Sequence, residues 1–205
     1  MATVVDGAIE RRLRELLHGD ARHEFATLAI ETYGAELYGF LVNVLGGAPN
    51  AAEVLAQAIE AFWRSLPEFR AACSVRTWLY MLARRTVRRY KRRLPNRLQH
   101  TGDRHLDDLV AFAHSRTAPW QRTTIKARFR DLREKLDSED RILLVLRIDR
   151  DMEWCDIAQV TLGAAAADGN AAELAREAAR LRKRFQLLKT KLRKHAREMG
   201  LLDEP

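Results

Sequence analysis

The sequence lacks several features that mark common protein classes. Its only two cysteines, Cys73 and Cys155, form no C-x-x-C pair, so we expect reduced thiols and neither a disulfide framework nor a zinc finger. It has no secretory signal and no apolar run of 18 residues, and we therefore expect a cytoplasmic protein without membrane insertion. P-loop, G-x-S-x-G and H-E-x-x-H motifs are also missing, so we expect neither an enzyme nor a cofactor.

Acidic residues are nearly absent from two segments of this chain, which carries +8 overall and has a pI near 9.9. Residues 70–97 hold ten basic and no acidic side chains, and residues 176–197 hold ten basic side chains and one acid, Glu177. These segments carry +10 and +9, so the rest of the chain carries −11. Two cationic segments on an otherwise acidic protein favour a polyanionic partner, with nucleic acid first and an anionic membrane surface second.

The apolar residues recur at helical spacing and no sustained strand alternation occurs, so we predict an all-α protein. The first long helix is expected over residues 24–45. A second helix is expected to open with Asn50 as its N-cap and Glu53 closing a capping box. Ser74 is expected to cap a third helix that ends at Leu94.

The changes in composition predict two small helical domains joined by a linker. The predicted units are an N-terminal extension (1–24), a first helical domain (25–94), a polar linker (95–118) and a second helical domain (119–205). In the second domain, helices over 138–148 and 153–162 precede a long basic helix from about Ala171. The order of a short helix, a connection and a long basic helix predicts a helix-turn-helix.

The third helix of the first domain separates into two faces on a helical wheel. One sector holds Val75, Leu79, Leu82, Ala83, Thr86 and Tyr90, and the opposite side holds Arg84, Arg88, Lys91 and Arg92. An ordinary solvated face is the alternative interpretation. The absence of any acid at i,i+4 favours an external anion, because like charges on one helix repel each other. Exposed aromatics and Met81 among these arginines would suit stacking on unpaired bases, at about 1 to 3 kcal/mol per base.

The long basic helix, residues 174–197, carries an apolar seam at alternating spacings of four and three. The seam consists of Leu174, Ala178, Leu181, Phe185, Leu188 and Leu192. A coiled coil is the alternative, but only three heptads are present and the surrounding face is almost entirely positive. We therefore expect this helix to enter the major groove of DNA. The candidate contacts are Arg176, Arg180, Arg182, Lys183 and Arg184.

The predicted linker gathers side chains that bind metals in other proteins. They are His100, Asp103, His105, Asp107, Asp108 and His114. No fixed ligand spacing and no rigid element supports a site, so a flexible polar linker is the preferred interpretation and no metal is expected.

Two parts of the sequence resemble the sigma factors of bacterial RNA polymerase, specifically the extracytoplasmic-function type. LPEFRAACSVRTWLYMLARRTVRRYKRR (66–93) resembles regions 2.3 to 2.4 of that family, with R-T-W-L-Y-x-x-A-R as its most specific element. LDSEDRILLVLRIDRDMEWCDIAQV (136–160) and LRKRFQLLKTKLR (181–193) resemble region 4. The resemblance covers roughly residues 25–93 and 131–198, so it implies a region 2-like first domain and a region 4-like second domain.

The resemblance implies a role for each domain. The first would bind polymerase core, melt the −10 promoter element and hold the nontemplate strand, and the second would read the −35 element. The −10 candidates by position are Phe69, Arg70, Ser74, Arg76, Trp78, Tyr80, Arg84, Arg85, Arg88 and Arg89. The polymerase-binding candidates are Asn50, Glu53 and Gln57. The implied partners are RNA polymerase core and promoter DNA, with an anti-sigma factor as a further candidate.

The sequence departs from the family pattern at three places. The helix that usually reads D-A-E-D-L-V-Q-E reads NAAEVLAQ over residues 50–57, and the tract at 164–175 is about a dozen residues longer than the family's turn. The segment 9–17 precedes the resemblance and is expected to be a surface helix. Two alternatives therefore stay open: a degenerate sigma-like interaction protein, and a free-standing helix-turn-helix regulator that needs no polymerase.

Overall fold

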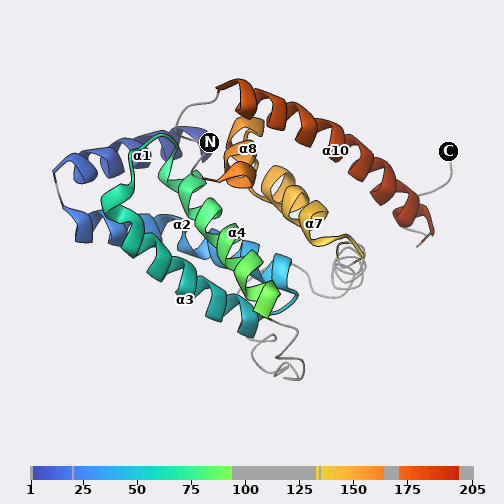
Figure 1. The fold of residues 1–205 in the computed structure, drawn as a ribbon, viewed down its shortest axis with the longest axis horizontal. Coiled ribbons are helices and arrows are strands. Elements are labelled where there is room, and N and C mark those ends of the chain that lie inside the picture. Colours follow the sequence, from blue (N-terminus) through green and yellow to red (C-terminus); the bar gives the residue numbers. More distant parts are fainter. Residues whose placement is uncertain (1, 20, 94–132, 134, 164–170, 199–205) are drawn as a thin grey trace.

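The computed structural model describes residues 2–19, 21–93, 133, 135–163 and 171–198 (Figure 1). These residues are helical almost throughout and contain no strand, which confirms the all-α prediction. The helices are α1 (Ala2–His18), α2 (Arg22–Leu45), α3 (Ala48–Ser65), the 3-10 turn η1 (Leu66–Glu68), α4 (Val75–Arg93), α7 (Ser138–Leu144), the π-helical turn η3 (Val145–Asp149), α8 (Trp154–Leu162) and α10 (Ala171–Glu198).

The turn between α2 and α3 is built differently from the prediction. Helix α2 ends as expected, at Gly46, whose φ of 74° is left-handed. The predicted N-cap at Asn50 is wrong, because α3 begins earlier, with Gly47 at the N-cap position and Pro49 in the first turn. Proline fits there because the first turn leaves its backbone N–H groups without helical partners. Asn50 instead accepts a hydrogen bond from the Tyr90 hydroxyl at 2.8 Å.

Helix α4 lies at the centre of the molecule and contacts α2, α3 and α8 (Figure 1). Its predicted cap is confirmed, since Ser74 Oγ accepts a hydrogen bond from the Thr77 N–H at 3.0 Å. The predicted outward position of Arg84 is wrong, because α8 packs on that side and leaves this arginine only 5% exposed. Helix α4 is therefore covered on more than the one face that its apolar pattern indicated.

Helix α1 is more than the surface helix expected for residues 9–17. Leu13 is fully buried, and Glu10 reaches the first turn of α4. The Glu10 carboxylate accepts hydrogen bonds from the backbone N–H groups of Val75 and Arg76 at 3.0 and 3.1 Å, and from the Tyr33 hydroxyl at 3.0 Å. Glu10 thus caps a helix from 65 residues away, which no local pattern reveals.

Helices α7, α8 and α10 pack together through the predicted apolar seam of α10. Ala178, Leu181, Phe185 and Leu188 are buried, and α10 contacts both α8 and α7. Asp137 caps α7 by accepting from the N–H groups of Glu139 and Asp140. The predicted linker, with its histidines and aspartates, lies outside the described residues. The division into two domains stays a prediction.

The helices of the two predicted domains are in contact in this structure. Buried apolar side chains form one cluster that includes members from Leu13 in α1 to Leu188 in α10. Helix α8 lies against α4, and α7 also contacts α2. A search of the described helices finds none with the length and apolar character needed to cross a membrane.

Candidate nucleic-acid interface

One stripe of α4 presents cations to solvent. Arg85, Arg88, Arg89 and Arg92 are exposed, and their spacing places them along one side of the helix. Among the residues that the structure describes, none of the four takes part in an ion pair. Since their mutual repulsion is not relieved within this part of the chain, the stripe is suited to binding an external polyanion.

The loop before α4 forms a small cavity beside this stripe. Phe69 stacks on Trp78 with ring centroids 4.0 Å apart and planes 7° apart. These rings, with Arg70, Cys73 and Arg85, belong to the lining of a cavity of about 160 Å³. Burial, with the nearby charges of Asp156 and Glu10, raises the pKa of Cys73 to about 12, so the thiol stays protonated at neutral pH.

The expectation that aromatics and Met81 of α4 are exposed for stacking on bases is wrong for Met81, Trp78 and Tyr80, since all three are buried. Tyr80 is fully buried and packs edge-on against Phe40, with ring centroids 5.2 Å apart, and Trp78 is 6% exposed. Burial, together with the charge of Glu36, raises the pKa of Tyr80. In this arrangement both rings stabilise the core, and the broad faces of neither are free to stack on a base.

Two arginines of α4 bind groups of this chain instead of solvent. Arg76 donates from Nε and Nη2 to the Glu36 carboxylate at 2.8 and 3.0 Å, and from Nη2 to the Arg150 carbonyl at 2.9 Å. Arg84 donates from Nη2 to Glu139 Oε2 at 2.5 Å and from Nη1 to the Thr161 carbonyl at 3.0 Å.

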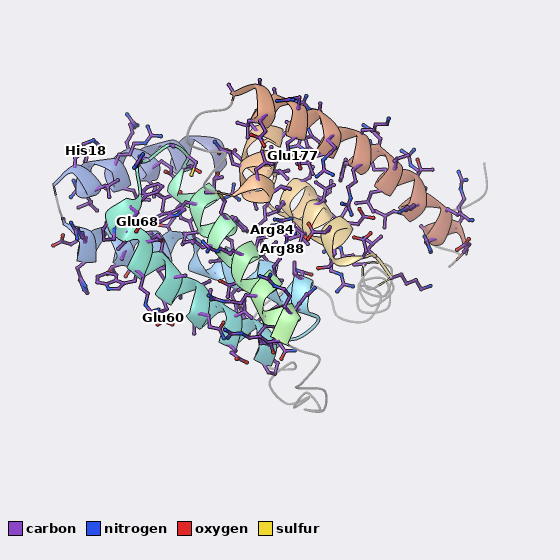
Figure 2. All side chains as sticks on the ribbon, viewed as in Figure 1. His18, Glu60, Glu68, Arg84, Arg88 and Glu177 are labelled. Atoms are coloured by element: carbon purple, nitrogen blue, oxygen red, sulfur yellow. The ribbon has the colours of Figure 1, made fainter. Side chains whose placement is uncertain are left out.

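These bonds use α4 arginines to hold the C-terminal helices. Figure 2 shows Arg84 and Arg88 on α4 at the side that faces α7, and both line the same cavities as Glu139. Arg88 is exposed although Arg84, one turn earlier, is buried. The border between bound and available arginines therefore falls within a single turn of α4.

The candidate contacts on α10 divide in a similar way. Arg176, Arg182 and Lys183 are exposed. Arg180 donates to both oxygens of Glu177 at 2.7 and 2.6 Å, and these hydrogen bonds and this charge raise the pKa of Arg180. The fifth candidate, Arg184, is also bound to carboxylates of this chain.

Arg184 joins α10 to the start of α7. Its Nε donates to Asp140 Oδ1 at 2.6 Å, and its Nη2 donates to Asp137 Oδ1 at 3.1 Å. The Asp140 side chain is 6% exposed. This partly buried pair therefore has a structural function in the described arrangement.

The polymerase-binding candidates lie on α3 and are partly engaged with one another. Gln57 Nε2 donates to Glu53 Oε1 at 3.3 Å, and Asn50 is held by Tyr90. Glu53 is exposed, as is Trp63 further along the same helix. The exposed side of α3 is therefore mildly polar with one large aromatic side chain.

The acids that bind α4 and α10 arginines were missed by sequence reasoning. Glu36 and Glu139 lie 40 and 55 residues from their partners Arg76 and Arg84. The sequence predictions considered only acids at i,i+4 on the same helix. A partner that is distant in the sequence produces no local spacing pattern by which it could be recognised. The acids at the start of α7 were a weak hint, since acidic residues there also suit a helix N-terminus.

Comparison with known protein families bears on α2, α3 and α4. Residues 29–96 match the sequence model of sigma-70 region 2. The match is to one region of the sigma-70 family and covers about a third of the chain. It spans most of α2 and all of α3 and α4, so the stripe and the loop cavity both lie within the matched segment. No curated protein matches the sequence.

Proposed function

We propose that this chain is a sigma factor of the extracytoplasmic-function type that acts in the cytoplasm with RNA polymerase core. Its region 2 helices melt and bind the −10 element, and the C-terminal helices read the −35 element through a helix-turn-helix formed by α8 and α10. The observation that carries the proposal is that the region 2 match falls on the helix with the exposed stripe Arg85, Arg88, Arg89 and Arg92, which has no ion pairs among the described residues.

The −10 candidates fall into groups with different roles. Arg70, Arg85, Arg88 and Arg89 are exposed and accessible to DNA as the protein stands. Arg84 becomes available only if the C-terminal helices move away from α4, because its guanidinium group bonds to Glu139 and Thr161. Arg76 would have to leave Glu36 of α2 as well as Arg150.

The remaining −10 candidates act mainly through the fold of region 2. Ser74 caps α4, and Trp78 and Tyr80 fill the core beneath the exposed arginines. Phe69 is partly buried and stacks on Trp78 at the loop cavity. These residues thereby fix the position of the stripe relative to the cavity.

On α10, the candidate contacts lie in the first half, and further exposed cations follow in the second half at Lys191, Arg193, Lys194 and Arg197. The helix has 28 residues, which corresponds to a length of about 42 Å at 1.5 Å per residue, so only part of it fits in a major groove. Arg176, Arg182 and Lys183 are exposed there. Arg180 and Arg184 are available only after they leave Glu177, Asp137 and Asp140.

The test is promoter opening with reconstituted core polymerase. The double charge reversal Arg85→Glu with Arg89→Glu should abolish permanganate reactivity of the −10 region, because both side chains are exposed and outside the core. The double reversal Arg11→Glu with Arg14→Glu, on the exposed face of α1, is the charge-matched control and should open promoters normally. Circular dichroism should show that both proteins fold. Normal −10 reactivity in the double variant would overturn the proposed role of the stripe.

One observation favours a second candidate, the degenerate sigma-like interaction protein. The α3 segment 50–57 retains one acid, Glu53, and Asn50 is occupied by Tyr90. Co-purification with core polymerase separates the two functions, since the sigma factor forms a stable complex and the interaction protein does not. A free-standing helix-turn-helix regulator would instead protect duplex DNA without polymerase.

A further inference from the structure

A cavity of about 770 Å³ lies between α4 on one side and α7 and α8 on the other. A second cavity, of about 360 Å³, adjoins it toward α10 and shares Arg84, Arg88 and Glu139 in its lining. Small-molecule sites in proteins have volumes of about 300 to 1,000 Å³. The cavity of about 770 Å³, the α4–α8 cavity, therefore has the size of a ligand site.

The α4–α8 cavity holds more positive than negative charge. Its lining includes Arg85, Arg88 and Arg92, which take part in no ion pair among the described residues. Lys91 adds a fourth cation, whose ammonium donates to Ser138 Oγ at 2.7 Å. The lining has one carboxylate, that of Glu139, and it is already bound to Arg84.

Arg84 also leaves a donor unused at this place. Its side chain is 6% exposed, it lines both cavities, and its Nε is buried without a hydrogen-bond partner. A buried N–H group without an acceptor is unfavourable, so an anionic oxygen near Arg84 would satisfy it.

The remaining walls of the cavity are apolar. Leu82, Val87, Ile142, Val160 and Leu162 line it beside the cations. A ligand with one apolar or aromatic part and one strongly anionic part complements both kinds of wall. Planar guanidinium groups bind phosphate oxygens in pairs, which makes phosphate the best match for the arginines.

We propose that the α4–α8 cavity binds a small phosphorylated molecule with an aromatic or apolar part, such as a nucleoside polyphosphate. Arg88, Arg92 and Lys91 bind its phosphates, and its ring lies against the apolar wall of Leu82 and Leu162. Because α4 and α8 both line the cavity, the ligand stabilises their contact and keeps Arg84 buried. This inference goes beyond promoter recognition and adds a small-molecule site to the proposed sigma factor.

The experiment measures binding of ATP and of inorganic triphosphate to the full chain by calorimetry, without divalent metal. About 0.15 M salt limits the range of general charge attraction to about 8 Å. Each test variant has a neighbouring control with the same charge change. Arg92→Gln and Arg88→Gln remove cations of the cavity, whereas Arg93→Gln and Arg89→Gln remove exposed cations outside its lining.

The expected result is that Arg92→Gln and Arg88→Gln each weaken ATP binding about tenfold, as the loss of a charge-assisted hydrogen bond predicts. The two control variants should change the affinity less than about twofold. ATP should also bind more tightly than triphosphate, because the apolar wall contacts the base, and should raise the thermal midpoint of the unmodified chain.

Two results would overturn the proposal. One is no ATP binding at millimolar concentration, and the other is an equal loss in all four variants, which general charge attraction produces. A short single-stranded oligonucleotide forms a separate arm, because DNA carries the same phosphate groups. If the cavity variants weaken oligonucleotide binding but not ATP binding, the cavity serves a DNA strand. Neither of the two overturning results would change promoter opening by the unmodified protein. The promoter-opening assay therefore tests the proposed sigma-factor function independently of the small-molecule site.

Discussion

Helices α4 and α10 are both strongly basic, and each has some cations bound by carboxylates of this chain and others that are exposed, but the bound cations lie at different places on the two helices. In α4 the stripe of Arg85, Arg88, Arg89 and Arg92 faces solvent without ion pairs among the described residues. In α10, Arg180 and Arg184 are bound by carboxylates of their own helix and of the α7 start. The charge of a segment therefore does not decide how much of it is available to DNA.

The largest expected effect comes from the contact between the two halves at Glu139. Glu139→Ala should lower the free energy of unfolding by about 2 to 3 kcal/mol, because Arg84 stays buried without its carboxylate. The expected cost is below that of a fully buried pair, since the Glu139 side chain is 38% exposed. Urea denaturation measures the change in the free energy of unfolding. Arg84→Met should cost less, because Glu139 can then be hydrated; the reverse order would contradict this account.

The second effect concerns the long-range cap on α4. Glu10→Ala should destabilise the protein by about 1 to 2 kcal/mol, because two backbone N–H groups of α4 and the Tyr33 hydroxyl lose their acceptor. Thermal denaturation should detect it. Glu15→Ala, which removes an exposed acid of the same helix, should change stability by less than about 0.5 kcal/mol. Equal effects of the two variants would show that the cap is unimportant.

The fold of each half could be predicted because its signals are local, and the contact between the halves could not. The seam from Leu174 to Leu192, the stop at Gly46 and the cap at Ser74 depend on neighbours within a few residues. The buried state of Arg84 depends on Glu139 and Thr161, which are 55 and 77 residues away in the sequence and meet it only through the packing of the two halves. Helical periodicity assigned one inward face to α4, whereas this helix is covered on several sides.

The same reason limits prediction of the candidate interface. Arg88 and Arg92 were correctly expected on an exposed cationic face, whereas Arg84, expected on the same face, is buried. Trp78 and Tyr80 were −10 candidates by their position in the sequence, but both are buried, because α4 is packed against several other helices. A residue type suited to DNA contact is thus informative only when combined with knowledge of what covers its helix.

A smaller effect is expected in α10 when the carboxylate that binds Arg180 is removed. Glu177→Gln should release Arg180 and increase the affinity for duplex DNA about twofold, while the slope of log affinity against log salt concentration becomes steeper by at most about 0.9. Fluorescence anisotropy over a salt series measures both quantities. The effect is small because the Arg180 side chain is 61% exposed and already partly screened. An unchanged salt slope would mean that Arg180 does not contact phosphate.

The smallest expected effect tests how α8 meets the start of α4, where Asp156 lies beside Thr77 and Arg76. Burial raises the pKa of Asp156 above its ordinary value of 3.8, although a hydrogen bond with Thr77 and the charge of Arg76 oppose the shift. A raised pKa means that the folded state binds the proton more tightly, so stability falls as pH rises through the window above 3.8. Asp156→Asn removes this loss and should make the protein slightly more stable at pH 7, with the difference vanishing below pH 3.8. Denaturation midpoints at several pH values measure the difference, and lower stability of the variant at pH 7 would show that the charge of Asp156 favours the contact between α8 and α4.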